Sequence, residues 1–406
     1  MSQQALVLDC YEHTLTVLRS LSRAGYEVTL GVTAEEMNRG YVHVSRFISS
    51  TWLHPDIVDE PAEFDAAIVD FLTGNPQLKL VFPVGENSVR ALAGIRADIP
   101  PGVLIAMPEN NIVETCFDKP SAYRIAEKCR IPVPATRTVN SSEELRDAVD
   151  ELGFPAIVKA SDSTSLLLGK KCVFVRTGLD LESLVDNWPE SSSDFVVQNE
   201  ITGQRHNCDI VAEKGQILLY FESKILRTDQ PDYAGNSVFD RSIPPTPLHR
   251  ECCERFVAEL NYTGVALIQF LRDAHTGESC FLEANPRAGS TIGLAVHCGI
   301  DLPAASVRAH VGNSPDSDRD YPVNRSQNWL HGDLLGIRKA RINGEIGLRK
   351  SLVWLARALV DFLRADSHTT FVWKDPKPTM KLYWNLLTRL FLKERRGSSR
   401  QSQDSM

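Results

Sequence analysis

The sequence contains no long apolar segment and no pair of cysteines at the spacing of a metal site. No unbroken hydrophobic run approaches the ~20 residues that span a bilayer, and the opening residues lack the basic and then apolar regions of a signal peptide. The nine cysteines include no C-x-x-C pair, which suits reduced, buried thiols rather than disulfides or a zinc site. These absences predict a cytoplasmic protein without a membrane span.

Several nucleotide and nucleophile signatures are also missing. The first predicted strand, 5–9, runs into Asp9-Cys-Tyr-Glu-His13 without the glycines that let a backbone approach a dinucleotide pyrophosphate. The chain has neither a Walker A loop nor a G-x-S-x-G elbow. A Rossmann-like domain that does not bind NAD is therefore expected.

What is present is the composition of an ordinary globular protein. The 406 residues are 43% hydrophobic and 24% charged, and a prior of ~150 residues per domain predicts two or three domains. The net charge of -8 is uneven, because residues 331–406 hold 15 Lys and Arg against 7 Asp and Glu. Residues 1–330 are correspondingly acidic, which argues against a nucleic-acid partner.

Hydrophobic patterning divides the chain into successive α/β and α+β regions. Strands at 5–9, 27–33, 80–83 and 103–107 alternate with helices at 14–24, 62–72 and 87–95, as in a doubly wound domain. A proline-rich hinge at 131–134 precedes a small α+β module, and an antiparallel sheet follows. The predicted regions are a Rossmann-like domain at 1–115, a lid at 116–190, a second lobe at 191–315, a linker with basic helices at 316–396, and a disordered tail at 397–406.

The strongest chemical signal joins two neighbouring predicted strands, 264–271 and 279–284. Gln269 lies in the first, while Glu283 and Asn285 lie two residues apart at the end of the second and project from one face. Three oxygen-bearing side chains suit Mg²⁺, and Arg287 follows where it can hydrogen-bond phosphate. The alternative is a hairpin whose polar residues face water.

Two lysines form a second signal. Lys159 lies inside an apolar strand, where an ammonium group is costly to bury without an anion. Lys119 follows Asp118 at the start of a predicted helix. A phosphate partner is one interpretation of each lysine, and a surface side chain with a buried stem is the other.

The order of these motifs resembles the ATP-grasp superfamily over about residues 1–312, within its carboxylate-amine ligase branch and its bacterial members with a helical C-terminal extension. The resemblance rests on Asp118-Lys119, Ile157-Val-Lys159, Gln198-Asn-Glu-Ile-Thr-Gly203 and Glu283-Ala-Asn-Pro-Arg287. It implies an ATP-grasp fold with an N-terminal pre-ATP-grasp domain. It further implies ATP as cofactor and Mg²⁺, or Mn²⁺, as the metal.

The resemblance also implies roles for individual residues. Lys119 and Lys159 would hold ATP phosphates, Arg287 would stabilise the transferred phosphoryl group, and the metal ligands would be Gln269, Glu283 and Asn285. The adenine would be lined by a four-residue segment: Gln198, Asn199, Glu200 and Ile201.

Three positions depart from the superfamily pattern. The loop expected to cover the phosphates has a single glycine, Gly169, and its hydroxyl groups belong to residues that include Ser161, Ser163 and Ser165. Asn199 stands where an adenine-side acid is common. His206 stands where a ribose-binding carboxylate is common, although an imidazole can also hydrogen-bond a ribose hydroxyl.

A basic pair, Lys224 and Arg227, ends a predicted strand before the loop 228–235. Two cations three residues apart can hold a carboxylate or an acyl phosphate, so both are candidate catalytic residues. A solvated basic edge is the alternative.

The sequence thus predicts an ADP-forming ligase that joins a carboxylate to an amine through an acyl phosphate. A kinase acting on a hydroxyl and a nucleotide-binding regulator without turnover are the alternatives. The expected partners are small-molecule acid and amine substrates, with a homodimer as a further option. Apolar positions among the C-terminal cations predict helices that pack on the protein, across a dimer, or on an anionic membrane surface: Leu352, Leu355, Leu359, Phe362, Leu363, Leu382, Trp384, Leu387, Leu390 and Phe391.

Overall fold

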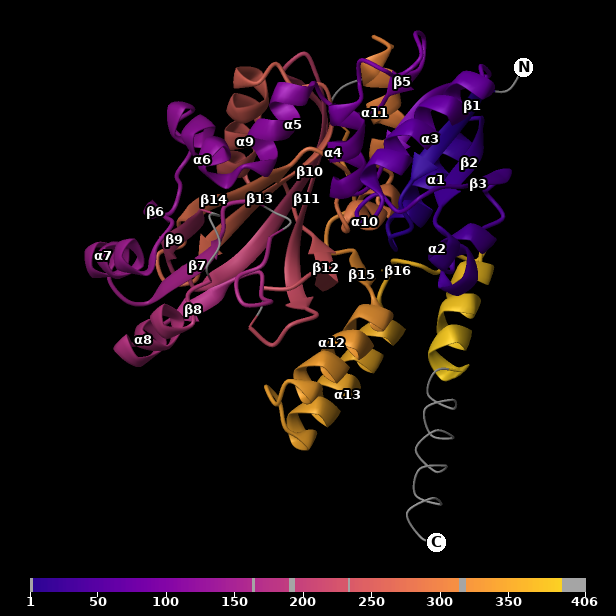
Figure 1. Cartoon of the computed structure of the whole chain (residues 1–406). Helices are drawn as coiled ribbons and strands as arrows, with labels where there is room; N and C mark the ends of the chain where they lie inside the picture. Colours follow the sequence, from indigo (N-terminus) through magenta and orange to yellow (C-terminus); the bar gives the residue numbers. More distant parts are fainter. Residues whose placement is uncertain (1–2, 163–164, 190–193, 233, 314–318, 389–406) are drawn as a thin grey trace, which may run out of the picture. The chain divides into compact units, whose positions relative to one another are not determined.

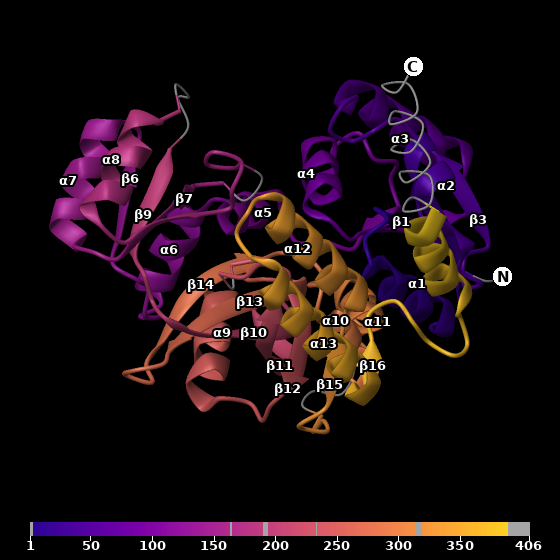
Figure 2. The same ribbon diagram turned by 90° about the horizontal axis from the view of Figure 1, so that it is seen from below.

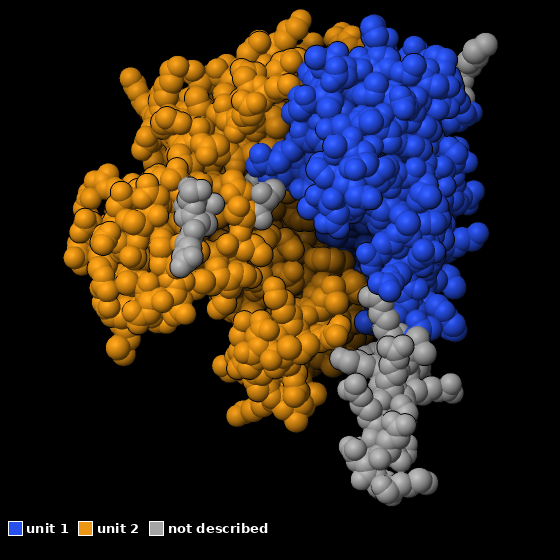
Figure 3. Space-filling model, viewed as in Figure 1, with its two compact units in different colours: residues 1–105, 368–406 blue, residues 106–367 orange. Residues whose placement is uncertain are grey.

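The computed structural model describes residues 3–162, 165–189, 194–232, 234–313 and 319–388. The chain divides into two compact units, one formed by residues 1–105 with 368–406 and the other by residues 106–367 (Figure 3). Each unit is described separately. Ser163, Leu390, Phe391 and the predicted disordered tail lie outside the described residues.

The first unit contains a parallel five-stranded sheet in the order β3-β2-β1-β4-β5 (Figure 1). Buried aliphatic runs on the central strands explain its burial on both faces. The strands are β1 (Gln3–Leu8), β2 (Tyr26–Val32), β3 (Ser50–Leu53), β4 (Leu78–Pro83) and β5 (Leu104–Ile105), and the helices are α1 (Thr14–Arg23), α2 (Ala34–Arg39), α3 (Pro61–Gly74) and α4 (Glu86–Gly94). The predicted Rossmann-like organisation is confirmed.

A carboxylate lies at the end of β1 in this sheet. Asp9 accepts hydrogen bonds from the backbone N–H groups of Val84 (3.3 Å) and Gly85 (2.7 Å) and from the Ser88 hydroxyl. The negative charge therefore occupies the N-terminal end of α4, where the helix dipole favours an anion.

The C-terminal segment 368–388 belongs to the same unit. Its Asp375 is fully buried and accepts hydrogen bonds from the Arg19 guanidinium (3.1 Å), the Ser45 hydroxyl (2.7 Å) and the Arg46 backbone N–H (3.0 Å). A helix covers 377–388. The region predicted as one extension, 316–396, is thus shared between the two units.

The second unit begins with α5 (Asn110–Phe117) and α6 (Lys119–Lys128), followed by a small antiparallel sheet in the order β6-β9-β7-β8. This module, the lid, contains β6 (Thr136–Val139), α7 (Ser142–Leu152), β7 (Ala156–Ala160), β8 (Val173–Val175), α8 (Gly178–Asp186) and β9 (Phe195–Asn199). Alternate residues of β7, such as Val158, pack on Leu145 and Val149 of α7. The intervening residues, including Lys159, face away from that core.

A seven-stranded sheet forms the rest of the unit, in the order β14-β13-β10-β11-β12-β15-β16 (Figure 2). Its strands are β10 (Gly203–Glu213), β11 (Gln216–Thr228), β12 (Ser237–Ser242), β13 (Gly264–Asp273), β14 (Ser279–Asn285), β15 (Ser326–Asn328) and β16 (Ser367–His368). The helices after β12 are α9 (Pro247–Glu259), α10 (Ile292–His297), α11 (Leu302–His310), α12 (Leu330–Ile342) and α13 (Leu348–Arg364).

The two faces of this sheet differ in chemistry. On one face Ile210, Phe270 and Phe281 pack with Tyr123 of α6 and Phe256 of α9 in a continuous apolar core. The opposite face carries a row of polar side chains that adjacent strands place in register: Glu283, Gln269, Asn207, Ser223 and Ser242. The polar face, which includes the candidate metal ligands, is therefore the place to look for a site.

Candidate active site

A β-bulge positions the predicted metal ligands. Gln269 pairs with Glu283, but the next residue of β13, Phe270, pairs with Phe281, so Leu282 is the extra residue. Without the bulge, Phe281 and Glu283 would face the same side. With it, Phe281 is fully buried in the apolar core and Glu283 lies on the polar face beside Gln269.

The three predicted ligands come together as expected from their spacing. Asn285 Nδ2 donates a hydrogen bond to Glu283 Oε1 (2.9 Å), and Gln269 Nε2 donates to Asn207 Oδ1 (2.7 Å). Both amides thus use their nitrogen atoms within the protein, so their oxygen atoms are the ones suited to a ligand. One carboxylate with two amide oxygens is a donor set that fits Mg²⁺.

Basic side chains surround the Glu283 carboxylate. Burial would raise the pKa of Glu283, but the Asn285 hydrogen bond and the charges of Lys119, Lys159 and Lys171 outweigh burial and lower the pKa. Glu283 is therefore ionised at neutral pH, next to three cations. This arrangement suits a polyanion together with a divalent cation.

Lys159 is held above the bulge by an aromatic side chain. Its Nζ donates to the Tyr123 hydroxyl (3.0 Å) and lies 5.7 Å from the centre of the Tyr123 ring. The same hydroxyl donates to the carbonyl of Leu282 (3.1 Å), the bulged residue. The ammonium group of Lys159 is thus linked to the strand that carries Glu283.

Lys119 binds the end of the lid strand β7. Its Nζ donates to the backbone carbonyls of Ala160 (2.9 Å) and Asp162 (2.8 Å), and its backbone N–H donates to Ser161 (3.1 Å). The two predicted phosphate-binding lysines therefore share the end of one strand. The loop that follows begins there, and the Ser165 backbone N–H donates to the Asp162 carboxylate (2.8 Å).

The predicted adenine segment uses its side chains within the lid. Gln198 donates to the Thr136 hydroxyl (2.7 Å), Asn199 donates to the Leu152 carbonyl (2.7 Å), and Glu200 accepts two hydrogen bonds from Arg176 (3.0 and 2.8 Å). These three side chains already have protein partners. Contacts to a base would therefore come from the main chain near Ile201.

Arg287 remains well placed for an anion. Its backbone N–H donates to Asn285 (2.8 Å), and its Nη1 donates to the Ala288 carbonyl (3.0 Å). Its Nε is buried without a hydrogen-bond partner among the described residues. A buried, unpaired guanidinium N–H is costly, and a phosphoryl oxygen would satisfy it.

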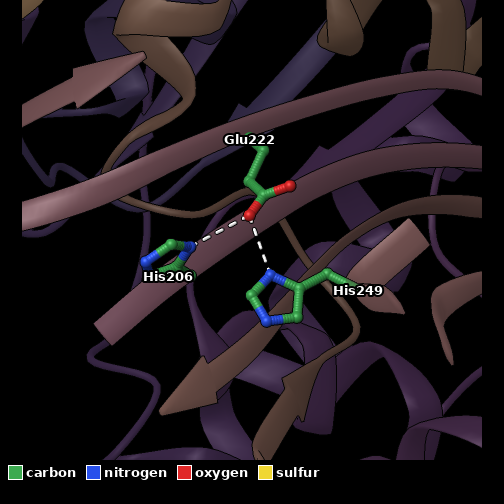
Figure 4. A group of neighbouring side chains, drawn as sticks. All are labelled: His206, Glu222 and His249. Atoms are coloured by element: carbon green, nitrogen blue, oxygen red, sulfur yellow. Dashed lines mark hydrogen bonds and ion pairs between the residues drawn. The ribbon is translucent and has the colours of Figure 1, made fainter. Parts of the chain in front are cut away.

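His206 lies on the opposite face of the sheet, away from the other predicted ligands. The register pairs it with Phe270 rather than with Gln269, and strand alternation turns its ring toward α9. There His206 Nδ1 and His249 Nδ1 both contact Glu222 Oε1, at 3.0 and 2.8 Å (Figure 4). The structure therefore does not place His206 near a nucleotide at the Glu283 site.

The ligand atoms of His206, Glu222 and His249 lie within 4.8 Å of one another, a set that Zn²⁺ accepts in other proteins. Here the carboxylate is already fully hydrogen-bonded, because Thr246 contributes its backbone N–H (2.7 Å) and hydroxyl (2.9 Å) and Tyr220 its hydroxyl (2.9 Å). Burial would raise the pKa of Glu222, but the hydrogen bonds of His206, His249 and the Thr246 backbone N–H lower it to about 2. We interpret the cluster as a buried charge network that joins α9 to the sheet.

Lys224 and Arg227, the two predicted catalytic cations, lie apart from the candidate metal ligands. The Arg227 guanidinium donates to Asp333 of α12 (2.7 and 2.9 Å) and pairs with Asp361 of α13. Lys224 pairs in register with His206 and therefore lies on the face opposite Glu283. Arg227 anchors the C-terminal helices, and neither residue is brought to the candidate metal site.

Three residues of the site escaped the sequence reasoning: Asn207, Lys171 and Arg205. Asn207 joins Gln269 to the Thr291 hydroxyl (3.2 Å), and Thr291 in turn donates to the buried Asp209 (2.8 Å). Arg205 lies two residues before Asn207 on the same face, and its pKa is lowered by burial despite the charge of Glu283. The alternation of side chains along Gly203-Gln-Arg-His-Asn207 could be seen in the sequence and places Arg205 and Asn207 on one face. The register that pairs Asn207 with Gln269 could not be seen there.

The chain matches known proteins over this region. The profile of a family described as "ATP-grasp in the biosynthetic pathway with Ter operon" matches residues 191–329. The C-terminal section of the carbamoyl phosphate synthase large chain from Methanopyrus kandleri is 24% identical over 250 residues, which are 59% of this chain and 43% of that protein. Pyruvate carboxylase from Pichia angusta is 33% identical over 230 residues, 52% of this chain and 19% of that protein. This chain thus spans less than half the length of these relatives.

Solved structures show the same fold. The biotin carboxylase domain of Hydrogenobacter thermophilus 2-oxoglutarate carboxylase, a dimer with MgADP and bicarbonate, aligns over 80% of this chain and 73% of its own, with a TM-score of 0.65 and 18% identity. N5-carboxyaminoimidazole ribonucleotide synthetase in complex with ADP aligns over 80% of both chains, with a TM-score of 0.62 and 13% identity. The chain has the ATP-grasp fold. Residues 191–329 match an ATP-grasp family, and the relatives resemble the chain over 48–59% of its length.

Proposed function

We propose that this protein is an ADP-forming ligase that joins a carboxylate to an amine. The observation that carries the proposal is the convergence at Glu283, where one carboxylate and two amides lie beside the charges of three lysines. The similarity to carbamoyl phosphate synthase and to N5-carboxyaminoimidazole ribonucleotide synthetase also supports ATP-dependent ligation.

The proposed ligation has two steps. A carboxylate oxygen of the acid attacks the γ-phosphorus of ATP, the bond to the β-phosphate oxygen breaks, and an acyl phosphate and ADP form. The amine then attacks the acyl carbon, inorganic phosphate leaves, and the amine loses a proton. The first step is needed because a free carboxylate is a poor electrophile.

The protein's contribution is mainly electrostatic. Lys159 and Lys171, together with Lys119, offset phosphate charge, and Arg287 uses its unpaired Nε for the transferred phosphoryl group. Gln269, Glu283 and Asn285 would hold Mg²⁺, or Mn²⁺ in its place, and the metal when bound would neutralise charge on the phosphates. The main chain near Ile201 is proposed to contact adenine, and the hydroxyls of Ser161, Ser163 and Ser165 to cap phosphates.

A substrate screen tests this proposal. Purified protein is incubated with Mg-ATP and combinations of carboxylic acids and amines, and ADP and inorganic phosphate are measured together. A ligase releases both in equal amounts only when acid and amine are both present. Release of ADP without phosphate, on addition of an alcohol alone, would instead establish a kinase.

A homodimer is a separate part of the proposal. The aligned 2-oxoglutarate carboxylase domain is described as a dimer, and a similar fold offers comparable surfaces. Light scattering on the purified chain measures its mass directly. A mass corresponding to one 45.2 kDa chain across a concentration series would contradict the dimer.

A further inference from the structure

The hairpin of α12 and α13 packs on the second unit through its polar side. The two helices lie side by side (Figures 1 and 2). Asp333 of α12 is fully buried and binds Arg227, and it also accepts a hydrogen bond from Trp354 Nε1 (2.8 Å). The buried residues of α13 are Ser351 and Ala358. The larger aliphatic side chains of α13 must therefore point elsewhere.

Those aliphatic side chains form a stripe on the exposed side of α13. Leu348, Leu352, Leu359 and Leu363 are 61%, 57%, 45% and 81% exposed. Their spacing of four, seven and four residues keeps them within an arc of about 60° on a helix of 3.6 residues per turn. We call these four leucines the leucine stripe.

A basic arc lies beside the leucine stripe. Arg349, Lys350, Arg357 and Arg364 are exposed, and helical spacing places them in the adjacent part of the circumference. The only acidic residue in α13, Asp361, is on the inner side and pairs with Arg227. The exposed face of α13 therefore combines apolar and positive character without negative charge.

The charge pattern of α13 favours one class of binding partner over the others. A second copy bound symmetrically through α13 would bring two basic arcs together with no acidic partner, which is unfavourable. Nucleic acid would match the cations but not the leucine stripe. An anionic lipid surface matches both, because headgroups attract the cations while leucines enter the acyl boundary.

We propose that α13 docks the protein on an anionic membrane surface, with the leucine stripe inserted and the basic arc at the headgroups. No helix among the described residues combines the length and apolarity needed to cross a bilayer, so α13 lies in the interface. Considered by itself, the C-terminal segment of the other unit also exposes two tryptophans, Trp373 (88%) and Trp384 (67%), in a stretch of sequence that contains Lys374 and Lys377. Tryptophan favours the bilayer interface.

Flotation of the full-length protein tests the proposal. Phosphatidylcholine vesicles containing about 30% phosphatidylglycerol are compared with pure phosphatidylcholine vesicles at low salt. The wild type should float with the anionic vesicles only, and about 0.5 M NaCl should weaken binding by screening. Failure of the wild type to float with anionic vesicles at low salt overturns the proposal.

Point variants assign the binding to α13. The triple substitution Leu352→Ser, Leu359→Ser, Leu363→Ser should reduce partition on the order of 100-fold, since each leucine loses much of its burial. Arg349→Gln with Lys350→Gln and Arg357→Gln should cost about fivefold per cation. Leu179→Ser on α8, where the leucine is 83% exposed, is the matched control and should float normally.

Nucleotide binding and thermal unfolding of the triple serine variant should equal those of the wild type, because the leucines are exposed. Unchanged flotation of that variant would contradict the assignment. A dimer that the variant converts to a monomer, without vesicle binding by either protein, would show that the stripe joins two copies.

Discussion

Two glutamates in the large sheet have their ionisation set by neighbours more than by burial. Glu283 is partly buried beside Asn285 and three lysine charges, and its pKa is lowered although burial alone would raise it. Glu222 follows the same rule on the other face of the sheet. Each carboxylate is therefore charged, but only Glu283 has oxygen-bearing neighbours suited to a metal.

Substitutions at Glu283 and Arg287 should separate metal binding from turnover. Glu283→Gln keeps the shape but removes the charge, so Mg²⁺-dependent nucleotide binding should weaken most at low Mg²⁺. Arg287→Ala should bind ATP yet form ADP on the order of 10²-fold more slowly, because its guanidinium acts on developing phosphoryl charge. Calorimetric titration and an ADP assay measure the two effects.

Glu278→Gln and Arg272→Ala are matched controls, since both residues are exposed in the same hairpin. They should retain wild-type nucleotide affinity and turnover. Wild-type ADP formation by folded Glu283→Gln and Arg287→Ala would show that β13 and β14 do not carry the active site.

Glu222 should make the stability of the protein sensitive to acid. Its folded pKa of about 2 is below the ordinary 4.5, so its stabilisation is complete above pH 4.5 and is lost as pH falls toward 2. The shift corresponds to about 3 kcal/mol. Glu222→Gln should therefore lower the unfolding free energy by about that amount at neutral pH, measured by urea titration.

The difference between wild type and Glu222→Gln should shrink as pH falls from 4.5 to 2. Glu254→Gln, an exposed change on α9, the helix that carries His249, should behave as wild type. The same two proteins also test for a metal at His206, Glu222 and His249. A chelator that destabilised the wild type but not Glu222→Gln would show that the cluster is a metal site.

At the scale of elements, one arginine joins three segments. Arg227 ends β11 and binds Asp333 and Asp361, which lie 106 and 134 residues further along the chain. Breaking a buried ion pair leaves an uncompensated charge, which typically costs 3–5 kcal/mol. The attachment of α12 and α13 should therefore depend strongly on this residue.

Arg227→Ala should loosen the hairpin without affecting nucleotide binding. Hydrogen exchange should accelerate across 330–364, while affinity for Mg-ATP stays that of the wild type. Arg227→Lys should restore part of the protection because it retains the charge but not the paired hydrogen bonds. Loss of turnover with unchanged exchange would instead support the substrate-binding role predicted from the sequence.

At the scale of the whole molecule, nucleotide should stabilise the fold. A ligand that binds only the native state at a hundredfold excess over its Kd adds about 2.7 kcal/mol. Mg-ATP or Mg-ADP should therefore raise the unfolding temperature, measured by calorimetry. Hydrogen exchange should slow at the end of β7 and along β14, and omission of Mg²⁺ should reduce both effects.

No thermal shift at millimolar Mg-ATP would contradict nucleotide binding. A shift retained fully in Glu283→Gln and without Mg²⁺ would mean that the nucleotide binds elsewhere. Hydrogen exchange can also show which of the two compact units binds the nucleotide. Protection confined to the second unit would place the nucleotide within 106–367.

The elements near the site could be predicted because their signals are local. Apolar runs at 264–271 and 279–284 match β13 (Gly264–Asp273) and β14 (Ser279–Asn285) closely. The two-residue spacing also placed Glu283 and Asn285 on one face, beside Gln269. What spacing could not reveal was the bulge at Leu282, which depends on pairing between two strands.

The sequence by itself determined the parallel first domain, the α+β lobes and the order of the basic motifs and the candidate metal ligands, because each depends on residues near one another in the chain. Only the tertiary structure decided which face each strand residue occupies and which distant charges meet. Strand register places His206 beside Glu222, and Arg227 pairs with acidic residues of helices more than 100 residues further along the chain. Register and long-range pairing are set by packing of the whole sheet, so no local pattern records them.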